Sequence, residues 1–212
     1  MPSSVDQRAP YKLGAIVAVV EEAHVDEKRP PRLLLEGRPG IGKTTVARRL
    51  LALLRDAGIP LGGFVTDEIR RGGHREGFAV QTVAGQRGVL AHVELPGPPR
   101  VGRYGVDLPA FERVALPAMA APQPVGVVVV VVVDELGRME LASAAFRDAM
   151  SDLLDREVAV VATVHVHRHP FTDALKRRPD LRVIPVTERS RDALPERLAA
   201  ELVAAGAARR RQ

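Results

Sequence analysis

Seven consecutive valines at residues 127–133 are the feature that most constrains how this 212-residue chain can fold. β-Branched side chains favour extended backbone, and a run without a polar residue leaves neither face of a strand suited to water. A central parallel strand with helices on both sides accounts for such a run. The apolar stretch around it, residues 125–133, is far shorter than the roughly 18–20 residues that a membrane-spanning helix needs. The run therefore predicts a buried sheet, and we expect no membrane partner.

Segments typical of strands and helices alternate on either side of the valines. Apolar runs predict strands at residues 32–36, 158–164 and 181–186. Apolar residues at helical spacing predict helices at 44–57, 141–154 and 192–208. Strands that alternate with helices indicate an α/β fold with a mostly parallel sheet and right-handed crossovers.

The middle of the chain has a different pattern, typical of antiparallel strands. Two β-like runs, residues 63–70 and 77–83, flank the hairpin connection Arg71-Gly72-Gly73-His74-Arg75, and residues 88–93 predict a third strand. We expect these strands to form an antiparallel β-hairpin appendage on the main sheet. A helix is predicted at 107–119, with Pro117 expected to interrupt it.

The chain is expected to divide into three parts. Residues 1–31 form an N-terminal extension, in which 13–20 either add a strand or belong to a segment without fixed structure. The stretch 13–20 could also imitate a signal-peptide core, but it is short and no convincing cleavage site follows, so we expect a cytoplasmic protein. Residues 32–208 form a single domain, and residues 209–212 form a basic tail.

Composition excludes several classes of function. The chain has no Cys, which rules out disulfides, thiol catalysis and thiolate zinc sites. Only 3% of residues are aromatic, and Trp is absent, so a stacking surface for single-stranded nucleic acid is not expected. The net charge is +5, and three of the basic residues are Arg209, Arg210 and Arg211. This balance makes nucleic acid an unlikely partner and suits small polyanions equally well.

A glycine-rich segment between the first predicted strand and helix carries the strongest chemical signal. Residues 37–44 read GRPGIGKT and match G-x-x-x-x-G-K-[ST] in full. Glycines allow successive backbone N–H groups to point inward, and the helix N-terminus adds positive potential, so the segment is suited to phosphates. We expect Lys43 to reach the β- and γ-phosphates and the Thr44 hydroxyl to bind Mg²⁺.

Two acidic residues, Asp134 and Glu135, directly follow the valine run. Ligands of open parallel sheets bind at the carboxyl ends of the strands, so both acids should face the phosphate-binding loop. We expect Asp134 to hold Mg²⁺, and Glu135 to orient or polarise an attacking water.

At this point the sequence resembles the THEP1-type nucleoside triphosphatases. The resemblance covers about residues 32–200. It rests on GRPGIGKTT at 37–45, GFVTDEIR at 63–70, GGHREGF at 72–78, VGRYGVD at 101–107 and DELGRMEL at 134–141, together with Thr163, His169-Pro170 and Val186-Thr187.

The resemblance implies a P-loop NTPase fold, a three-layer α/β sandwich related to small-molecule kinases. It implies Mg²⁺-dependent hydrolysis of ATP, GTP and other nucleoside triphosphates, with loose base selectivity and slow turnover. The nucleotide-binding residues that it implies are Gly37, Arg38, Pro39, Gly40, Ile41, Gly42, Lys43, Thr44 and Thr45, with Val131, Val132, Val133, Asp134, Glu135, Leu136, Gly137 and Arg138.

The chain departs from the family pattern at two positions. The family usually has Lys where this chain has Arg138, which keeps the charge but changes its geometry. The family often reads T-x-x-N-R where this chain has Thr187-Glu188-Arg189-Ser190-Arg191, so Ser190 puts a base contact at that position in doubt.

Two further groups of side chains have both a functional and a structural interpretation. One arginine among Arg70, Arg71, Arg75 and Arg103 could stabilise charge on the transferred phosphoryl group, with Arg75 the first candidate, or all four could form a solvated face. His165, His167 and His169 alternate and could bind a metal, but we favour a polar strand end that turns into a loop at Pro170.

Two enzymatic functions remain open at this stage. A hydrolase would use Glu135 to position water, with Lys43 and one arginine as the other catalytic residues. A P-loop kinase would pass the γ-phosphoryl group to a nucleoside, nucleotide or other small acceptor, with the arginine-rich hairpin as a lid. The family resemblance favours the hydrolase. We expect the protein to be a monomer. A nucleotide-gated switch would need a partner surface that the sequence does not identify.

Overall fold

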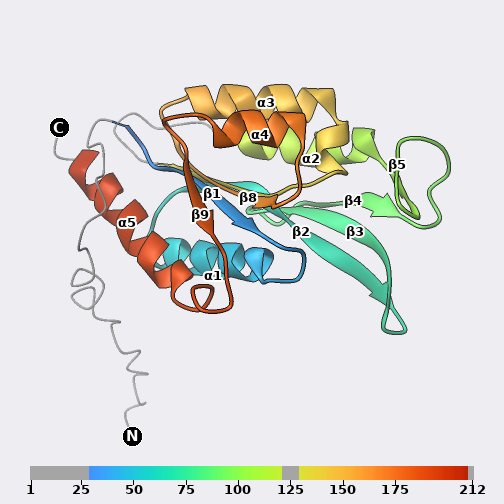
Figure 1. Ribbon diagram of the computed structural model, residues 1–212, viewed down its shortest axis with the longest axis horizontal. Helices are drawn as coiled ribbons and strands as arrows, with labels where there is room; N and C mark the ends of the chain where they lie inside the picture. Colours follow the sequence, from blue (N-terminus) through green and yellow to red (C-terminus); the bar gives the residue numbers. More distant parts are fainter. Residues whose placement is uncertain (1–28, 121–128, 210–212) are drawn as a thin grey trace, which may run out of the picture.

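Nine strands form one mixed sheet in the part of the chain that the computed structural model describes, residues 29–120 and 129–209 (Figure 1). The strands are β1 (Arg32–Gly37), β2 (Leu61–Arg71), β3 (His74–Thr82), β4 (Arg87–His92), β5 (Arg100–Val101), β6 (Tyr104–Val106), β7 (Val130–Leu136), β8 (Ala159–His165) and β9 (Arg182–Pro185). The helices are α1 (Lys43–Asp56), α2 (Leu108–Met119), α3 (Ala144–Asp155), α4 (Pro170–Lys176) and α5 (Leu194–Arg209), with a 3₁₀ turn, η3 (Glu140–Ala142).

The sheet has a parallel half and an antiparallel half. Its strand order is β5-β6-β4-β3-β2-β7-β8-β1-β9. The pairs β2–β7, β7–β8, β8–β1 and β1–β9 are parallel. The pairings from β2 through β3, β4 and β6 to β5 are antiparallel. The predicted α/β fold class with its antiparallel hairpin is therefore confirmed, and the hairpin continues the main sheet.

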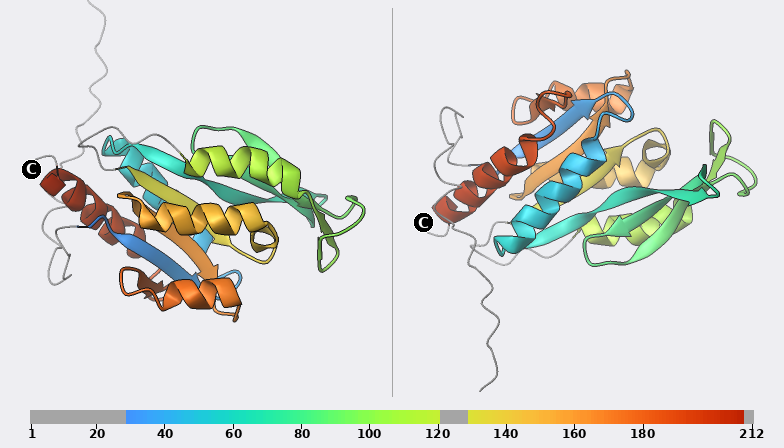
Figure 2. Two further views of the ribbon diagram at one scale, coloured as in Figure 1. Left: turned by 90° about the horizontal axis from the view of Figure 1, so that it is seen from above. Right: turned by 90° about the horizontal axis from the view of Figure 1, so that it is seen from below.

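The valine strand β7 lies inside the sheet and supplies both of its faces. Val131 and Val133 pack into the core under α2 and α3, whereas Val130 and Val132 pack into the core under α1 and α5. All four are at most 1% exposed. Figure 2 shows the two helical layers from opposite sides, with the β2–β3 hairpin extending beyond both. The valine run is thus continuous because each face of the strand meets its own helical layer.

Several predicted elements need correction. Pro117 does not interrupt α2, which continues to Met119. Because Pro117 lies in the last turn, its missing N–H and its ring affect only the end of the helix. The helix predicted from residue 141 begins instead at Ala144, because Ser143 caps it by accepting a hydrogen bond from the Phe146 N–H at 3.0 Å.

Other differences concern short elements and the ends of the chain. Pro170 begins helix α4 where a loop was predicted, and the Nδ1 atom of His169 accepts a hydrogen bond from the Phe171 N–H. The short strands β5 and β6 were not predicted. The possible strand at 13–20 and the first two valines of the run lie outside the described residues.

Candidate active site

The loop between β1 and α1 is shaped to receive an anion. Gly40 and Gly42 have φ angles of 76° and 108°, in the left-handed region that glycine adopts without strain. Helix α1 begins at Lys43, and no side chain caps it. The helix N-terminus therefore presents backbone N–H groups and positive potential at the carboxyl edge of the sheet.

Lys43 lies beneath this loop and is only 5% exposed. Its Nζ donates hydrogen bonds to the carbonyl oxygens of Gly37, at 3.0 Å, and Arg38, at 3.4 Å. The same atom is 4.0 Å from Glu135 Oε2. The ammonium group is thus held between the loop and the end of β7, where the sequence predicted that the two meet.

Asp134 is fully buried within β7, at a bulge in the sheet. Val133 and Leu136 of β7, three positions apart, pair with Ala162 and Val164 of β8, only two positions apart, so β7 has one extra residue here. Asp134 Oδ1 accepts a hydrogen bond from the Thr163 hydroxyl at 2.6 Å. Burial raises the pKa of Asp134 and the charge of Glu135 adds to this, whereas the hydroxyls of Thr163 and Thr44 act in the opposite direction.

The side chains at this point suit a magnesium ion. Asp134 Oδ2 is buried and has no hydrogen-bond partner in the described part of the chain. The Thr44 hydroxyl lies close enough to affect the pKa of Asp134. A carboxylate and a hydroxyl are hard oxygen donors, and Mg²⁺ in phosphate sites needs only one or two protein ligands besides water and phosphate. Asp134 and Thr44 would hold the ion, which could neutralise charge on bridging phosphate oxygens.

Glu135 lies between two basic side chains. One carboxylate oxygen, Oε1, lies in direct contact with Nε2 of His165, the last residue of β8. The other oxygen, Oε2, faces Lys43. Burial raises the pKa of Glu135, but His165 and Lys43 outweigh it, and the pKa lies below its ordinary value. Glu135 is therefore ionised at neutral pH, as a group that orients water must be.

A third carboxyl group, Glu140, lies behind this pair and was not predicted. It is 5% exposed, and a Cβ atom added to Gly137 would come within 2.6 Å of its Oε2. Burial raises the pKa of Glu140 to about 8, and the charges of Glu135 and Asp134 act in the same direction. Glu140 is thus protonated at neutral pH.

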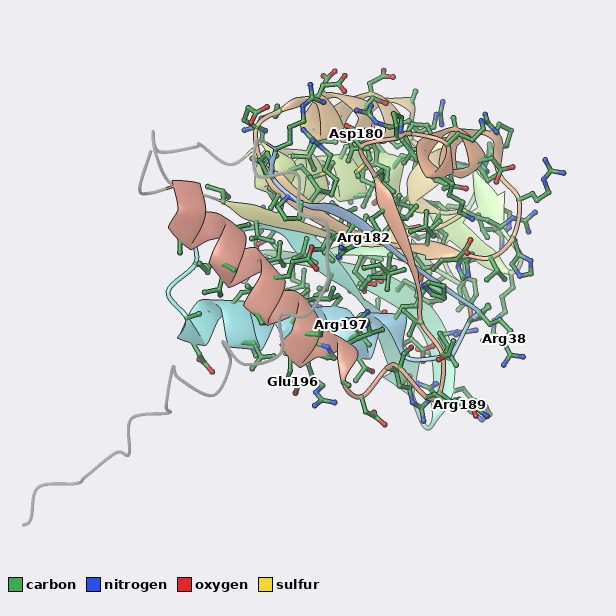
Figure 3. The ribbon with its side chains drawn as sticks, turned by 60° about the vertical axis from the view of Figure 1, so that its left-hand side comes forward. Arg38, Asp180, Arg182, Arg189, Glu196 and Arg197 are labelled. Carbon is green, nitrogen blue, oxygen red and sulfur yellow. The ribbon has the colours of Figure 1, made fainter. Side chains whose placement is uncertain are left out.

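Two adjoining pockets open beside the phosphate-binding loop. Their volumes are about 530 and 430 Å³, and they share Arg38, Ile41, Val166 and Glu188. The first also includes Glu36, Gly37, Pro185, Val186, Thr187 and Arg189, and the second Pro39, Gly40, His167 and Arg191. Figure 3 shows Arg38 and Arg189 at the same end of the molecule, on the loops after β1 and β9. The pockets are large enough for a nucleoside next to the phosphate loop.

Ser190 supports the loop that borders these pockets. Its hydroxyl accepts a hydrogen bond from the Thr187 N–H at 3.0 Å and donates to the Pro185 carbonyl at 3.3 Å. Ser190 does not line either pocket. Arg191 reaches the loop after β1, where it donates a hydrogen bond to the Ile41 carbonyl at 3.3 Å.

Arg70, Arg75 and Arg103 of the antiparallel half are engaged locally, and Arg71 is exposed at the end of β2. Arg75 donates hydrogen bonds to the Tyr104 hydroxyl at 3.1 Å and to Glu68 Oε1 at 2.6 Å, and its guanidinium lies 5.1 Å from the ring centre of Phe78. Arg103 lies against the Tyr104 ring. Within the described residues these contacts do not connect Arg75 with the phosphate loop, so its catalytic role stays a prediction.

The three alternating histidines do not act as a group. His165 pairs with Glu135, His169 caps α4, and His167 borders the second pocket. The described residues contain no cluster of three His, Asp or Glu side chains arranged to hold a metal. The preferred structural interpretation of these histidines missed the contact of His165 with Glu135, whose one signal is the position of His165 at the carboxyl end of a strand beside the predicted site.

The fold and this edge of the sheet define a P-loop nucleotide-binding protein of the α/β class. Residues 32–199 match the model of the NTPase family. The nucleoside-triphosphatase THEP1 of Thermotoga petrophila is 39% identical over 163 residues, which are 77% of this chain and 88% of that protein. The human cancer-related nucleoside-triphosphatase is 38% identical over 177 residues, covering 76% of this chain and 91% of its own length.

A solved structure agrees with these sequence matches. The crystal structure of THEP1 from Aquifex aeolicus superposes with a TM-score of 0.71 and 31% identity, covering 81% of this chain and 98% of that chain. The chain belongs to the NTPase family. The prediction of an enzyme of the nucleoside-triphosphatase class is thereby confirmed. None of the helices in the described ranges has the length and apolar character required to cross a bilayer.

Proposed function

We propose that this enzyme hydrolyses ATP, GTP and other nucleoside triphosphates to the diphosphate and inorganic phosphate, in a Mg²⁺-dependent reaction with loose base selectivity. The observation that carries the proposal is the meeting of Lys43, at the uncapped start of α1, with Glu135 at 4.0 Å. An ammonium group for the γ-phosphate and a carboxylate for water thus occupy one site.

In the proposed reaction each residue has a separate role. The backbone N–H groups at the start of α1 and the Lys43 ammonium bind the phosphate chain. The Glu135 carboxylate accepts a hydrogen bond from a water molecule, aims its oxygen at the γ-phosphorus, and takes up its proton as the P–O bond forms. The bond from the γ-phosphorus to the β–γ bridging oxygen breaks, and the electron pair leaves with the diphosphate.

The pockets beside the loop support loose base selectivity. Their charged lining comes from long side chains such as Arg38, Glu188 and Arg189, which can adjust to a purine or a pyrimidine. That the active unit is a monomer stays a prediction. The cytoplasmic location stays a prediction.

Phosphate release from Mg-ATP and from Mg-GTP, each without an acceptor, tests the proposal. We expect steady release that is lost in Lys43→Ala and falls by roughly 10²–10⁴-fold in Glu135→Gln, because general-base catalysis contributes about that much. Glu196→Gln is the matched control, since Glu196 is exposed and pairs with Arg49 on the outer surface of the helices.

Two outcomes would contradict hydrolysis. Phosphate release that stays at background, together with formation of nucleoside diphosphate and a phosphorylated acceptor once a nucleoside or nucleotide is added, would establish the kinase alternative. Tight nucleotide binding with negligible turnover, with or without acceptors, would instead favour a nucleotide-gated switch.

A further inference from the structure

His165 occupies a position that ties the two halves of the site together. It is the last residue of β8, and its Cα pairs with that of Gly37, where β1 enters the phosphate-binding loop. Its Nε2 contacts Glu135 on the other neighbouring strand, β7. Its carbonyl oxygen accepts a hydrogen bond from Lys176 Nζ at 3.3 Å, which fixes the backbone at this point. The backbone of His165 is thus fixed independently of the carboxylate, and its ring reaches Glu135 with Nε2, whereas Nδ1 has no hydrogen-bond partner among the described residues.

Glu135 has two competing partners in this arrangement. Its side chain is only 18% exposed, and its two oxygens face His165 and Lys43. A carboxylate that moved fully onto Lys43 would neutralise the ammonium group needed for the γ-phosphate. It would also point away from the water that the proposed reaction requires. Some group must therefore hold Glu135 away from Lys43 while leaving it ionised.

We propose that His165 is a positioning residue for Glu135. Its imidazole retains Oε1, so that Oε2 keeps the direction needed to orient the attacking water, and Lys43 stays available to phosphate. This role rests on the proposed function, in which Glu135 activates water. The positioning role depends on the contact between His165 and Glu135. It requires neither the neighbouring His167 nor a metal bound by the histidines.

The test compares turnover with nucleotide affinity in variants of the full chain. In His165→Ala we expect kcat for Mg-GTP to fall roughly 10–100-fold, the size of effect typical when a supporting side chain is lost. The Kd for a non-hydrolysable GTP analogue should change less than about threefold, because phosphate binding depends on Lys43 and the loop. In His165→Gln the amide nitrogen can replace Nε2, and most of kcat should return.

His92→Gln is the matched control for a histidine beside a glutamate. His92 Nε2 lies 4.0 Å from Glu76 Oε2 on the antiparallel half of the sheet, away from the proposed site. This variant should keep the wild-type kcat and Kd. A similar loss of kcat in His165→Ala and in His92→Gln would mean that the effect is one of stability, and it would overturn the proposal.

A double-variant cycle provides the decisive comparison, with single-turnover rates used to measure slow chemistry. If His165 acts through Glu135, then adding His165→Ala to Glu135→Gln should lower the rate less than twofold further. An equal loss in both backgrounds, or a wild-type kcat in His165→Ala, would overturn the proposal. Absence of hydrolysis in the unmodified protein would instead remove the proposed function, so the two failures can be told apart.

Discussion

At the scale of single residues, the site is notable for how closely carboxyl groups are crowded together. The charge of Glu135 raises the pKa of Asp134, and both acids raise the pKa of Glu140, yet Glu135 itself has a pKa below its ordinary value. The difference follows from the partners, because Glu135 has His165 and Lys43 beside it. Glu140 is instead kept neutral by burial and by its acidic neighbours. The same small region thus keeps Glu135 ionised, as a group that orients water must be, and keeps Glu140 protonated.

The protonated state of Glu140 predicts a pH-dependent stability. The folded state keeps this proton up to about pH 8, whereas an ordinary glutamate loses it near 4.5. Between these values the folded state binds one proton more, so its stabilising contribution is complete below pH 4.5 and is lost as the pH rises toward 8. The slope is about 1.4 kcal/mol per pH unit. Urea unfolding at pH 6 and pH 8 should show that Glu140→Gln loses less stability than the wild type on going to pH 8.

The exposed Glu196 provides the reference for this measurement. Glu196→Gln should reproduce the wild-type change in unfolding free energy between the two pH values, because its carboxyl is solvated and pairs only with Arg49. If Glu140→Gln shows the same slope as the wild type, Glu140 is already ionised in the folded state, and the prediction is wrong.

The sequence predicted the local parts of this site and missed the parts that come from distant segments. The motif around Lys43 and the acids at 134 and 135 are contiguous patterns, and the structure brings them together. The contact of His165 with Glu135 joins residues thirty positions apart, which no local pattern encodes. The burial of Glu140 depends on a 3₁₀ turn that packs under α2, where a helical pattern was expected.

At the scale of elements, the apolar runs predicted the central strands because burial on both faces leaves one clear pattern. The short elements were harder. Strands β5 and β6 have two and three residues, and α4 has seven, too few for a periodicity to show. Their conformation is decided by tertiary contacts, such as the pairing of β6 with β4. The boundaries of α3 depended on a cap that propensity alone does not select.

The joint between the two halves of the sheet depends on one glycine. Gly63 in β2 pairs with Val132 of β7, and its φ is +92°. A Cβ atom added there would lie 1.9 Å from the Val132 carbonyl oxygen. Because that oxygen belongs to the backbone of the central strand, it cannot yield without disturbing the sheet. Gly63→Ala should therefore lower the unfolding free energy by more than about 4 kcal/mol in urea denaturation.

Gly85 separates the effect of the clash from that of the backbone angle. Its φ is +95°, nearly the same, but a Cβ atom there would meet nothing within 4 Å. Gly85→Ala should cost only about 1–2 kcal/mol, the strain of a left-handed residue. Equal losses in the two variants would show that β2 and β7 can separate enough to accept a side chain, contrary to the prediction.

At the scale of the whole molecule, phosphate binding joins elements that lie far apart in the sequence. The loop after β1, the end of β7 and the end of β8 meet at one edge of the sheet, and the β9–α5 loop closes the pockets beside them (Figures 1 and 3). A nucleotide that contacts all of them binds the folded chain and not the unfolded one. Ligand binding should therefore stabilise the protein as a whole.

Thermal unfolding measures this coupling without relying on catalysis. A non-hydrolysable nucleotide at 100 times its Kd, with Mg²⁺, adds about 2.7 kcal/mol, and a chain of this size gains roughly 2–4 °C per kcal/mol. We therefore expect Tm to rise by about 5–10 °C in the wild type and in Glu135→Gln. At the same nucleotide concentration the rise should be largely lost in Lys43→Ala, and reduced when EDTA removes Mg²⁺, because the phosphate chain then lacks its cations. An equal rise in Lys43→Ala would place the nucleotide away from the loop, whereas loss of the rise in Glu135→Gln would assign that residue to binding instead of to the chemical step.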